Sequence, residues 1–297
     1  MKEQIADRIL HTPPLLFDGA IGSRLIGMGL PAGQAPEAWI LSQADKIRQV
    51  HEEYTQAGAN VITTCSFGGN RIRLKKGSLD RKCDAINRRA VEIAKEASQG
   101  KTYIAGGMGP TGEFFQPHGL LTEESADKTF IEQAGILADC SIDFFLLETH
   151  YDLKEALISL NACRKTAPSI PVAVTMTFNS TPNGFFTVMG DSAVEALKTL
   201  SDNGAFLVGS NCTLEAEGMV KLAKYLVTEI DTPLLIQPNA GTPEITPDGV
   251  VYPQKADEFA QSAQQILSSG VHAFGGCCGS DATHISALRV LIDKNFR

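Results

Sequence analysis

The sequence contains no apolar run near the roughly 18 consecutive residues that cross a membrane. Its first residues, MKEQIADRILHTPP, carry charges every few positions and lack the apolar segment of a secretory signal. A basic stripe is missing as well, since the 297 residues carry a net charge of −8 and the Lys and Arg residues are scattered. We therefore expect a cytoplasmic protein that binds neither membranes nor nucleic acid.

Common nucleotide and protease motifs are also missing. No G-x-x-x-x-G-K-[ST] or H-E-x-x-H motif occurs. Residues 107–112, GMGPTG, match G-x-G-x-x-G, but Pro110 lies inside the match and no helical pattern follows it directly. The one basic cluster, NRIRLKK at residues 70–76, is explained better by a solvated loop or helix end than by a phosphate site.

Seven cysteines are an odd number, which fits free or metal-bound thiols better than a disulfide framework. Two of them are neighbours in FGGCCGS, residues 274–280. Adjacent Cα atoms lie about 3.8 Å apart, and a relaxed disulfide needs about 4.4–6.8 Å. The pair is therefore either two inert buried thiols or two ligands of a soft metal ion.

Short apolar runs alternate with amphipathic stretches along the whole chain. Several stretches end in Gly, as helices often do. Such alternation predicts a parallel sheet covered by helices on its faces. Eight units without a linker favour a single (β/α)8 TIM barrel over residues 1–297, with its core at about residues 10–294, and a doubly wound open sheet is the alternative. The eight runs are residues 14–19, 60–68, 102–110, 143–150, 171–178, 206–213, 233–241 and 271–279.

The unusual polar residues fall at the C-terminal ends of these runs, where barrel enzymes carry their chemistry. Cys212 ends the sixth run and the Cys277–Cys278 pair ends the eighth, so the three thiols are expected on one rim. Three sulfur ligands suit zinc and leave a fourth position open, whereas three inert core thiols are the alternative. The full set is Asp18, Cys65, Glu148, His150, Asn211, Cys212, Asn239, Cys277 and Cys278.

The remaining cysteines and histidines are expected to pack or to face solvent. Cys65 ends the second run, across the barrel from the trio, and stays outside the metal set. Among the histidines, His150 is the one placed to reach the site, because it ends the fourth run. Packing or surface roles are expected for six further residues, which are Cys83, Cys140, Cys163, His51, His118 and His284.

Six short motifs make the pattern more specific. FDGAIGS, GPTGE, LLET, NCT, PNAG and GGCCG occur in the order and spacing of the homocysteine S-methyltransferase family, over residues 10–294. The chain therefore resembles that family of zinc barrels. The stretch TTCSFGGNRIRLKK is most similar to the homocysteine-binding module of cobalamin-dependent methionine synthases.

The resemblance implies that Cys212, Cys277 and Cys278 bind Zn²⁺ and that the homocysteine sulfur joins them as a zinc-bound thiolate, which is methylated to methionine. It also implies that Asp18 and Glu148 hold the amino end of homocysteine, and that Asn239 lies near the metal when substrate is absent. The chemistry agrees. A free thiol has a pKa near 8.5, and bound zinc deprotonates a coordinating thiol.

The resemblance favours a methylcorrinoid as methyl donor, either methylcobalamin or a corrinoid protein partner. Eight units take up the chain and the D-x-H-x-x-G signature of corrinoid carriers is missing, so the donor must come from outside. Phe114 and Phe115 offer an apolar docking surface for it. S-Methylmethionine or betaine as donor is one alternative, and a non-catalytic zinc or thiol sensor is another. Cys65 and His150 depart from the residues common in relatives, which leaves both donor and acceptor open.

Overall fold

The computed structural model describes residues 3–31, 33–246 and 249–296. Eight parallel strands form one sheet in the order β1-β12-β9-β8-β5-β4-β3-β2, and a parallel bridge between Phe17 and Val61 joins its two edges. Each strand lies within or overlaps one of the eight predicted runs, so the (β/α)8 barrel is confirmed and the open sheet is wrong. The strands are β1 (Leu15–Leu16), β2 (Val61–Thr63), β3 (Tyr103–Met108), β4 (Phe144–His150), β5 (Val172–Met176), β8 (Leu207–Glu215), β9 (Leu234–Asn239) and β12 (Ala273–Phe274).

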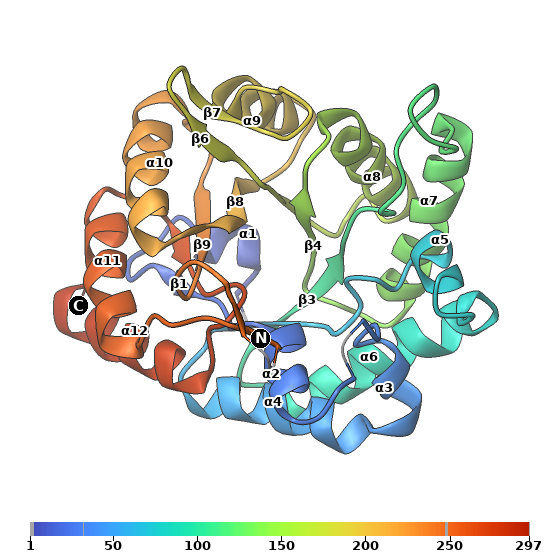
Figure 1. Ribbon diagram of the computed structural model, residues 1–297, viewed down its shortest axis with the longest axis horizontal. Helices are drawn as coiled ribbons and strands as arrows, with labels where there is room; N and C mark the ends of the chain where they lie inside the picture. Colours follow the sequence, from blue (N-terminus) through green and yellow to red (C-terminus); the bar gives the residue numbers. More distant parts are fainter. Residues whose placement is uncertain (1–2, 32, 247–248, 297) are drawn as a thin grey trace.

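Helices surround the barrel as an outer ring (Figure 1). Asp281 caps the last helix through its contacts with the backbone N–H groups of Thr283 and His284, as the sequence predicts. The helices are α1 (Ile5–Arg8), α2 (Ile21–Gly27), α3 (Ala38–Ser42), α4 (Ala44–Gln56), α5 (Arg71–Lys75), α6 (Cys83–Ser98), α7 (Glu123–Asp139), α8 (Leu153–Thr166), α9 (Ala193–Asp202), α10 (Ala216–Glu229), α11 (Ala256–Ser268) and α12 (Ala282–Asn295), with a 3-10 turn at Asp80–Lys82.

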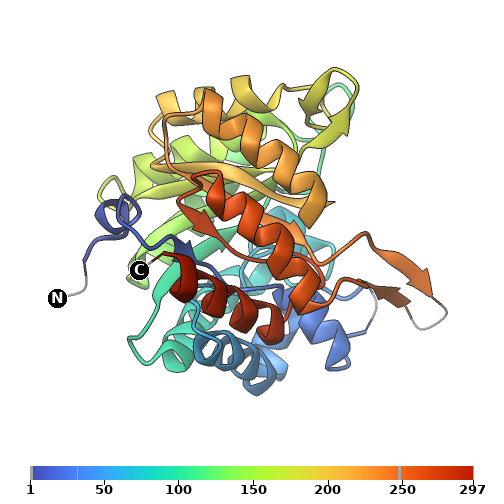
Figure 2. The ribbon, with the colours of Figure 1, turned by 90° about the vertical axis from the view of Figure 1, so that its left-hand side faces the viewer.

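The core has two layers because alternate strand residues face opposite sides of the sheet. Phe17, Phe144 and Leu146 belong to the cluster inside the barrel, which Ile5 and Ile9 of the N-terminal segment join. This segment lies at one end of the barrel (Figure 2). The second, larger cluster lies between the strands and the helices. The N-terminal segment thus packs on one end of the barrel interior, and chemistry is left to the other end.

Two antiparallel hairpins that the sequence analysis did not predict follow strands β5 and β9. One pairs β6 (Asn179–Thr181) with β7 (Gly184–Phe186), and the other pairs β10 (Glu244–Thr246) with β11 (Gly249–Val251). The β10–β11 hairpin projects from the end of the barrel opposite α1 (Figure 2). None of the described helices combines the length and apolar character that crossing a membrane requires.

Candidate metal and substrate site

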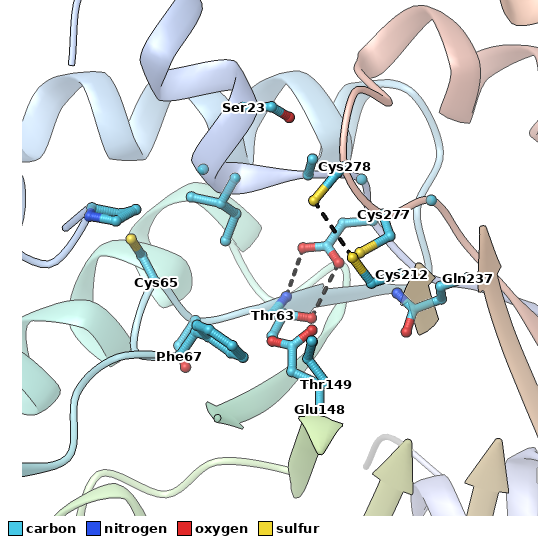
Figure 3. A pocket seen from close by; sticks show the side chains of 18 of the residues that line it. Ser23, Thr63, Cys65, Phe67, Glu148, Thr149, Cys212, Gln237, Cys277 and Cys278 are labelled. Carbon is cyan, nitrogen blue, oxygen red and sulfur yellow. Dashed lines mark hydrogen bonds between the residues drawn. The ribbon is translucent and has the colours of Figure 1, made fainter. Parts of the chain in front are cut away.

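The sulfur atoms of Cys212, Cys277 and Cys278 lie within 4.8 Å of one another, and those of Cys212 and Cys278 are 3.9 Å apart (Figure 3). Tetrahedral zinc with Zn–S bonds of about 2.3 Å requires sulfur–sulfur distances of about 3.8 Å. The donor set therefore fits zinc in chemistry and in spacing. Within the described residues, no other group of three His, Cys, Asp or Glu side chains is close enough to hold a metal.

An irregular strand end brings Cys212 to the other two cysteines. Cys212 and Thr213 have φ angles of +61° and +63°, and the pairing of β8 with β9 shifts register between Asn211 and Glu215. This left-handed backbone is costly for residues other than Gly, and for β-branched Thr213 above all. Gly279, at φ +84°, provides the matching turn after Cys278. The unfavourable backbone conformation of Cys212 and Thr213 therefore brings the Cys212 sulfur close to those of Cys277 and Cys278.

Amide side chains of neighbouring strands contact the sulfur atoms. Asn211 donates from Nδ2 to Cys277 Sγ at 3.7 Å, while its Oδ1 accepts the Thr149 N–H and the Thr175 hydroxyl, each at 2.8 Å. The neighbouring thiols of Cys277 and Cys278, and the Asn239 side chain to a lesser degree, hold the pKa of Cys212 well below its usual range. Cys212 is therefore the first of the three to become a thiolate.

A cavity of about 340 Å³ opens beside the sulfurs. It is large enough for a drug-sized ligand, so a small amino acid would fill only part of it. The side chains and backbone that line it come from the loops after β1 and β2 and from the ends of β4, β8, β9 and β12. They are Asp18, Gly19, Ala20, Ile21, Gly22, Ser23, Pro36, Glu37, Thr63, Thr64, Cys65, Phe67, Arg73, Glu148, Thr149, Cys212, Gln237, Gly276, Cys277 and Cys278.

Two acidic side chains face this cavity. Burial raises the pKa of Asp18 to about 7, although hydrogen bonds from Thr63 oppose the rise. Burial also raises the pKa of Glu148 to about 8, and the charges of Asp18 and Cys212 add to the effect. Within the described residues, neither carboxyl group has an ion-pair partner. A cationic group of a ligand would stabilise the ionised form of both.

The family model for homocysteine S-methyltransferase matches residues 15–292 of the chain. The chain belongs to the homocysteine S-methyltransferase family. Among curated relatives, the methionine synthase of Mycobacterium leprae is 28% identical over 98% of this chain and 25% of that protein. The S-methylmethionine–homocysteine S-methyltransferase BHMT2 of Pongo abelii is 28% identical over 97% of this chain and 80% of its own length. This chain thus spans about a quarter of the methionine synthase.

A solved structure shows the same fold. The metallated form of the homocysteine methyltransferase MmuM from Escherichia coli superposes with a TM-score of 0.81, at 20% identity, over 97% of this chain and 99% of that chain. The predicted family resemblance is confirmed. The matched range contains the six residues to which the resemblance gives a role in binding zinc or homocysteine, which are Asp18, Glu148, Cys212, Asn239, Cys277 and Cys278.

Three of the other predicted residues differ in how they lie relative to the cavity. Asn239 is buried at the end of β9 and does not line the cavity, and its Oδ1 has no partner in the described structure. Cys65 does line the cavity, on the side away from the three sulfurs (Figure 3). His150 is fully buried, does not line the cavity, and lies beside Phe130 of α7 with ring centres 6.3 Å apart.

Glu37 and Arg73, which the sequence analysis did not select, also line the cavity. Glu37 accepts the Gly68 N–H at 2.5 Å, and Arg73 lies over the Phe67 ring at 4.6 Å. Arg73 belongs to the NRIRLKK cluster that was expected to be solvated. The structure corrects that expectation, because Arg73 lines the cavity and donates to the Pro110 carbonyl at 3.3 Å. The basic cluster is the one sequence feature that could have pointed to Arg73 as a cavity residue. No comparable feature points to Glu37.

Proposed function

We propose that this protein methylates the sulfur of homocysteine to form methionine, with Zn²⁺ held by Cys212, Cys277 and Cys278. The observation that carries the proposal is the position of three mutually close sulfurs on the wall of a cavity that Asp18 and Glu148 also line, where neither carboxyl group has an ion-pair partner among the described residues. Zinc at such a site supplies a deprotonated thiol at neutral pH. We further propose that residues 1–297 form one homocysteine-binding domain, with its core at about residues 10–294.

Asp18 and Glu148 would bind the ammonium group of homocysteine. Both are kept partly protonated by burial, so an ammonium ion between them would favour the charged carboxylates and orient the substrate. Thr63 holds Asp18 in place with two hydrogen bonds. Asn239 would stand near the metal when substrate is absent. Two observations support this role: Asn239 helps to lower the pKa of the Cys212 thiol, and its Oδ1 has no hydrogen-bond partner within the described residues.

The transfer itself forms one bond and breaks one. The thiolate sulfur of homocysteine attacks the donor methyl carbon, and the leaving group departs with the electron pair of its bond to that carbon. The thiol proton leaves before the attack. The task of this chain is to place the sulfur and methyl carbon in line, which is the entropic part of the rate enhancement. The carboxyl groups and sulfurs fix the two ends of homocysteine for that purpose.

For the donor we propose a methylcorrinoid, free methylcobalamin or a corrinoid protein partner. Methionine synthases among the relatives support this choice. The loop after β3 adds exposed apolar side chains on the open rim, since Phe114 is 48% and Leu120 is 86% exposed. Phe115 is more enclosed, with Lys154 Nζ 4.7 Å from its ring centre, and offers less docking surface.

A sulfonium or betaine donor is the second candidate, favoured by one observation. Glu37, Phe67 and Arg73 line the cavity, and Phe67 lies on the side away from the sulfurs (Figure 3). A small donor with a cationic methyl group and a carboxylate would find both charges matched by Glu37 and Arg73. The coverage of 80% of BHMT2, a protein named for S-methylmethionine, points the same way.

Parallel assays decide between these donors. Zinc-loaded protein and homocysteine are incubated with methylcobalamin, a methylated corrinoid protein, S-methylmethionine, S-adenosylmethionine or betaine, and methionine is measured. The Cys278→Ala variant is the matched control. Methionine from a corrinoid donor supports the first choice, and methionine from a sulfonium or betaine donor alone supports the second. Homocysteine binding without methionine from any donor would make the protein a sensor and overturn the proposed activity.

A further inference from the structure

Arg73 is the only cation among the described residues that line the cavity, and no described residue forms an ion pair with it. Its guanidinium carbon lies 4.6 Å from the centre of the Phe67 ring, a contact that holds the flat group in place. Its Nη1 donates to the Pro110 carbonyl at 3.3 Å. The other N–H groups of Arg73 have no acceptor among the described residues, so an anionic group of a ligand would find donors ready for it.

Glu37 is an acid in the same part of the cavity. It is 2% exposed and lines the cavity. Its Oε1 accepts the N–H of Gly68, the residue after Phe67, at 2.5 Å. Burial raises the pKa of the Glu37 carboxyl group, and the charge of Arg73 opposes the rise. The two opposite charges thus contact the same short segment, Phe67–Gly68, without an ion pair between them.

Buried polar contacts fix this segment before any ligand binds. Ser66, which precedes Phe67, donates from Oγ to the Gly107 carbonyl at 2.7 Å, and its own carbonyl accepts Nε2 of Gln133 at 2.8 Å. The Gly109 N–H donates to the Phe67 carbonyl at 2.8 Å. The segment that Glu37 and Arg73 contact is therefore rigid, which lowers the entropic cost of binding a ligand there.

Arg73 and Glu148 contact different positions along the end of β3. A Cβ atom on Gly107 would lie 3.5 Å from Glu148 Oε1, and a Cβ atom on Gly109 would lie 2.3 Å from the Phe67 ring. Arg73 contacts the carbonyl of the residue after Gly109. Three residues of chain span at most about 11 Å. Arg73 therefore lies beyond Phe67 from the carboxyl group proposed to bind homocysteine, and the cavity of about 340 Å³ has room for a second small ligand.

The charges of the cavity restrict the chemistry of that ligand. Arginine binds carboxylate and phosphate groups through paired hydrogen bonds. Three carboxyl groups, those of Asp18, Glu37 and Glu148, line the same cavity, so a phosphate dianion would be repelled. A carboxylate carried by a molecule that also has a positive charge would match Arg73 and Glu37 together.

We infer that Arg73 and Glu37 form a second subsite, which binds a small zwitterion beside homocysteine: Arg73 takes the carboxylate and Glu37 the cationic end. The inference rests on the proposed function, which places homocysteine in the other part of the cavity. Among small methyl donors, Arg73 would select those that carry a carboxylate. The inference concerns binding, and its test does not depend on which donor supplies the methyl group.

Probes without a transferable methyl group test the subsite by binding alone. The zwitterions 3-aminopropionate, 4-aminobutyrate and 5-aminopentanoate differ in the distance between their charges, butyrate lacks the cation, and n-butylamine lacks the carboxylate. Ligand-observed NMR titrations of zinc-loaded protein with saturating homocysteine measure the dissociation constants. We expect the best zwitterion to bind about 10- to 100-fold more tightly than either analogue with a single charge, and inorganic phosphate not to compete with it.

Substitutions locate the bound zwitterion. Arg73→Gln and Glu37→Gln should each weaken its binding about 10- to 100-fold and leave the affinity for homocysteine unchanged, and glutamine at position 37 keeps an acceptor for the Gly68 N–H. Asp18→Asn should do the reverse. Lys75→Gln is the matched control, because it removes an exposed positive charge from the same helix, α5, and should change neither affinity.

Arg73→Lys guards against a glutamine variant that fails to fold. It keeps the charge but loses the paired donors, so its affinity for the zwitterion should lie between those of the wild type and Arg73→Gln. Wild-type affinity for the zwitterion in both Arg73 variants, or displacement of homocysteine by the zwitterion, would overturn the inference. A protein that bound both ligands at once but made no methionine from any donor would refute the proposed activity and leave this inference standing.

Discussion

Asp18 and Thr63 are joined by two hydrogen bonds: Asp18 Oδ2 accepts the Thr63 backbone N–H at 2.7 Å, and Oδ1 accepts the Thr63 hydroxyl at 3.1 Å. The carboxyl group is thereby fixed with one side toward the cavity. It is 2% exposed. An acid held this rigidly, with no ion-pair partner among the described residues, is arranged for a ligand that brings its own positive charge.

Asp18→Asn and Glu148→Gln should each weaken homocysteine binding about 10- to 100-fold, because a hydrogen bond to a charged group contributes about 1.5–3 kcal/mol. Isothermal titration calorimetry with zinc-loaded protein measures the affinity. Zinc content should stay at the wild-type level, since neither carboxyl group belongs to the sulfur trio. Unchanged affinity in both variants would show that the amino group is bound elsewhere.

Replacement of Cys212, Cys277 or Cys278 by Ala should remove the single zinc ion expected per chain. The barrel should stay folded, because the sulfurs lie on the rim and not in the two core clusters. Metal analysis and circular dichroism of the purified variants check both points. Cys65→Ala is the control: Cys65 lines the same cavity away from the trio, so its loss should leave the metal in place. Full zinc occupancy in Cys278→Ala would refute the three-sulfur site.

The buried histidine His51 should make the fold sensitive to acid. Burial lowers its pKa to about 4, and neither ring nitrogen has a partner in the described structure. The unfolded chain, with an ordinary His pKa near 6.5, binds the proton more readily, so stability falls as pH drops from about 6.5 toward 4. Burial lowers the pKa of His150 to about 3, an effect of the same sign.

His51→Leu should therefore reduce the stability lost between pH 7 and pH 5 by about 2 kcal/mol. Urea unfolding at both pH values measures this difference. The exposed His118, replaced by Asn, serves as control and should leave the pH dependence unchanged. An equal loss of stability in His51→Leu and the wild type would mean that His51 does not contribute.

Gly209 in β8 should tolerate no side chain. A Cβ atom there would lie 1.8 Å from the backbone oxygen of Leu235 in β9, which cannot move without disturbing the barrel. We expect Gly209→Ala to lower the free energy of unfolding by about 3 kcal/mol. Gly27→Ala is the control, because Gly27 ends α2 and, apart from its own helix and chain neighbours, no atom of the described residues lies within 4 Å of the added methyl group. Thermal unfolding of both variants makes the comparison, and equal stability would contradict the close contact.

For His150, the alternation of side chains along a strand does not predict which side of the barrel wall the residue faces. It ends β4, and simple alternation leaves open whether it faces the cavity. Thr149 has a φ of +64°, and the pairing of β4 with β5 shifts register between Leu147 and His150. The irregularity interrupts the alternation, and His150 is buried next to Phe130 of α7 instead of lining the cavity. The left-handed residue responsible is a threonine, which carries no sequence signal for that conformation.

The eight strand and helix units can be predicted from local patterns alone, because their signals repeat along the chain. The sequence by itself also determined the sulfur trio, since C-terminal strand ends always meet at one rim of a barrel. The other residues that reach that rim could be identified only from the three-dimensional structure. Glu37 and Arg73 lie between strands of the barrel, in segments whose paths depend on contacts such as Glu37 with Gly68 and Arg73 with Pro110. Such contacts join residues far apart in the chain, and no local pattern encodes them.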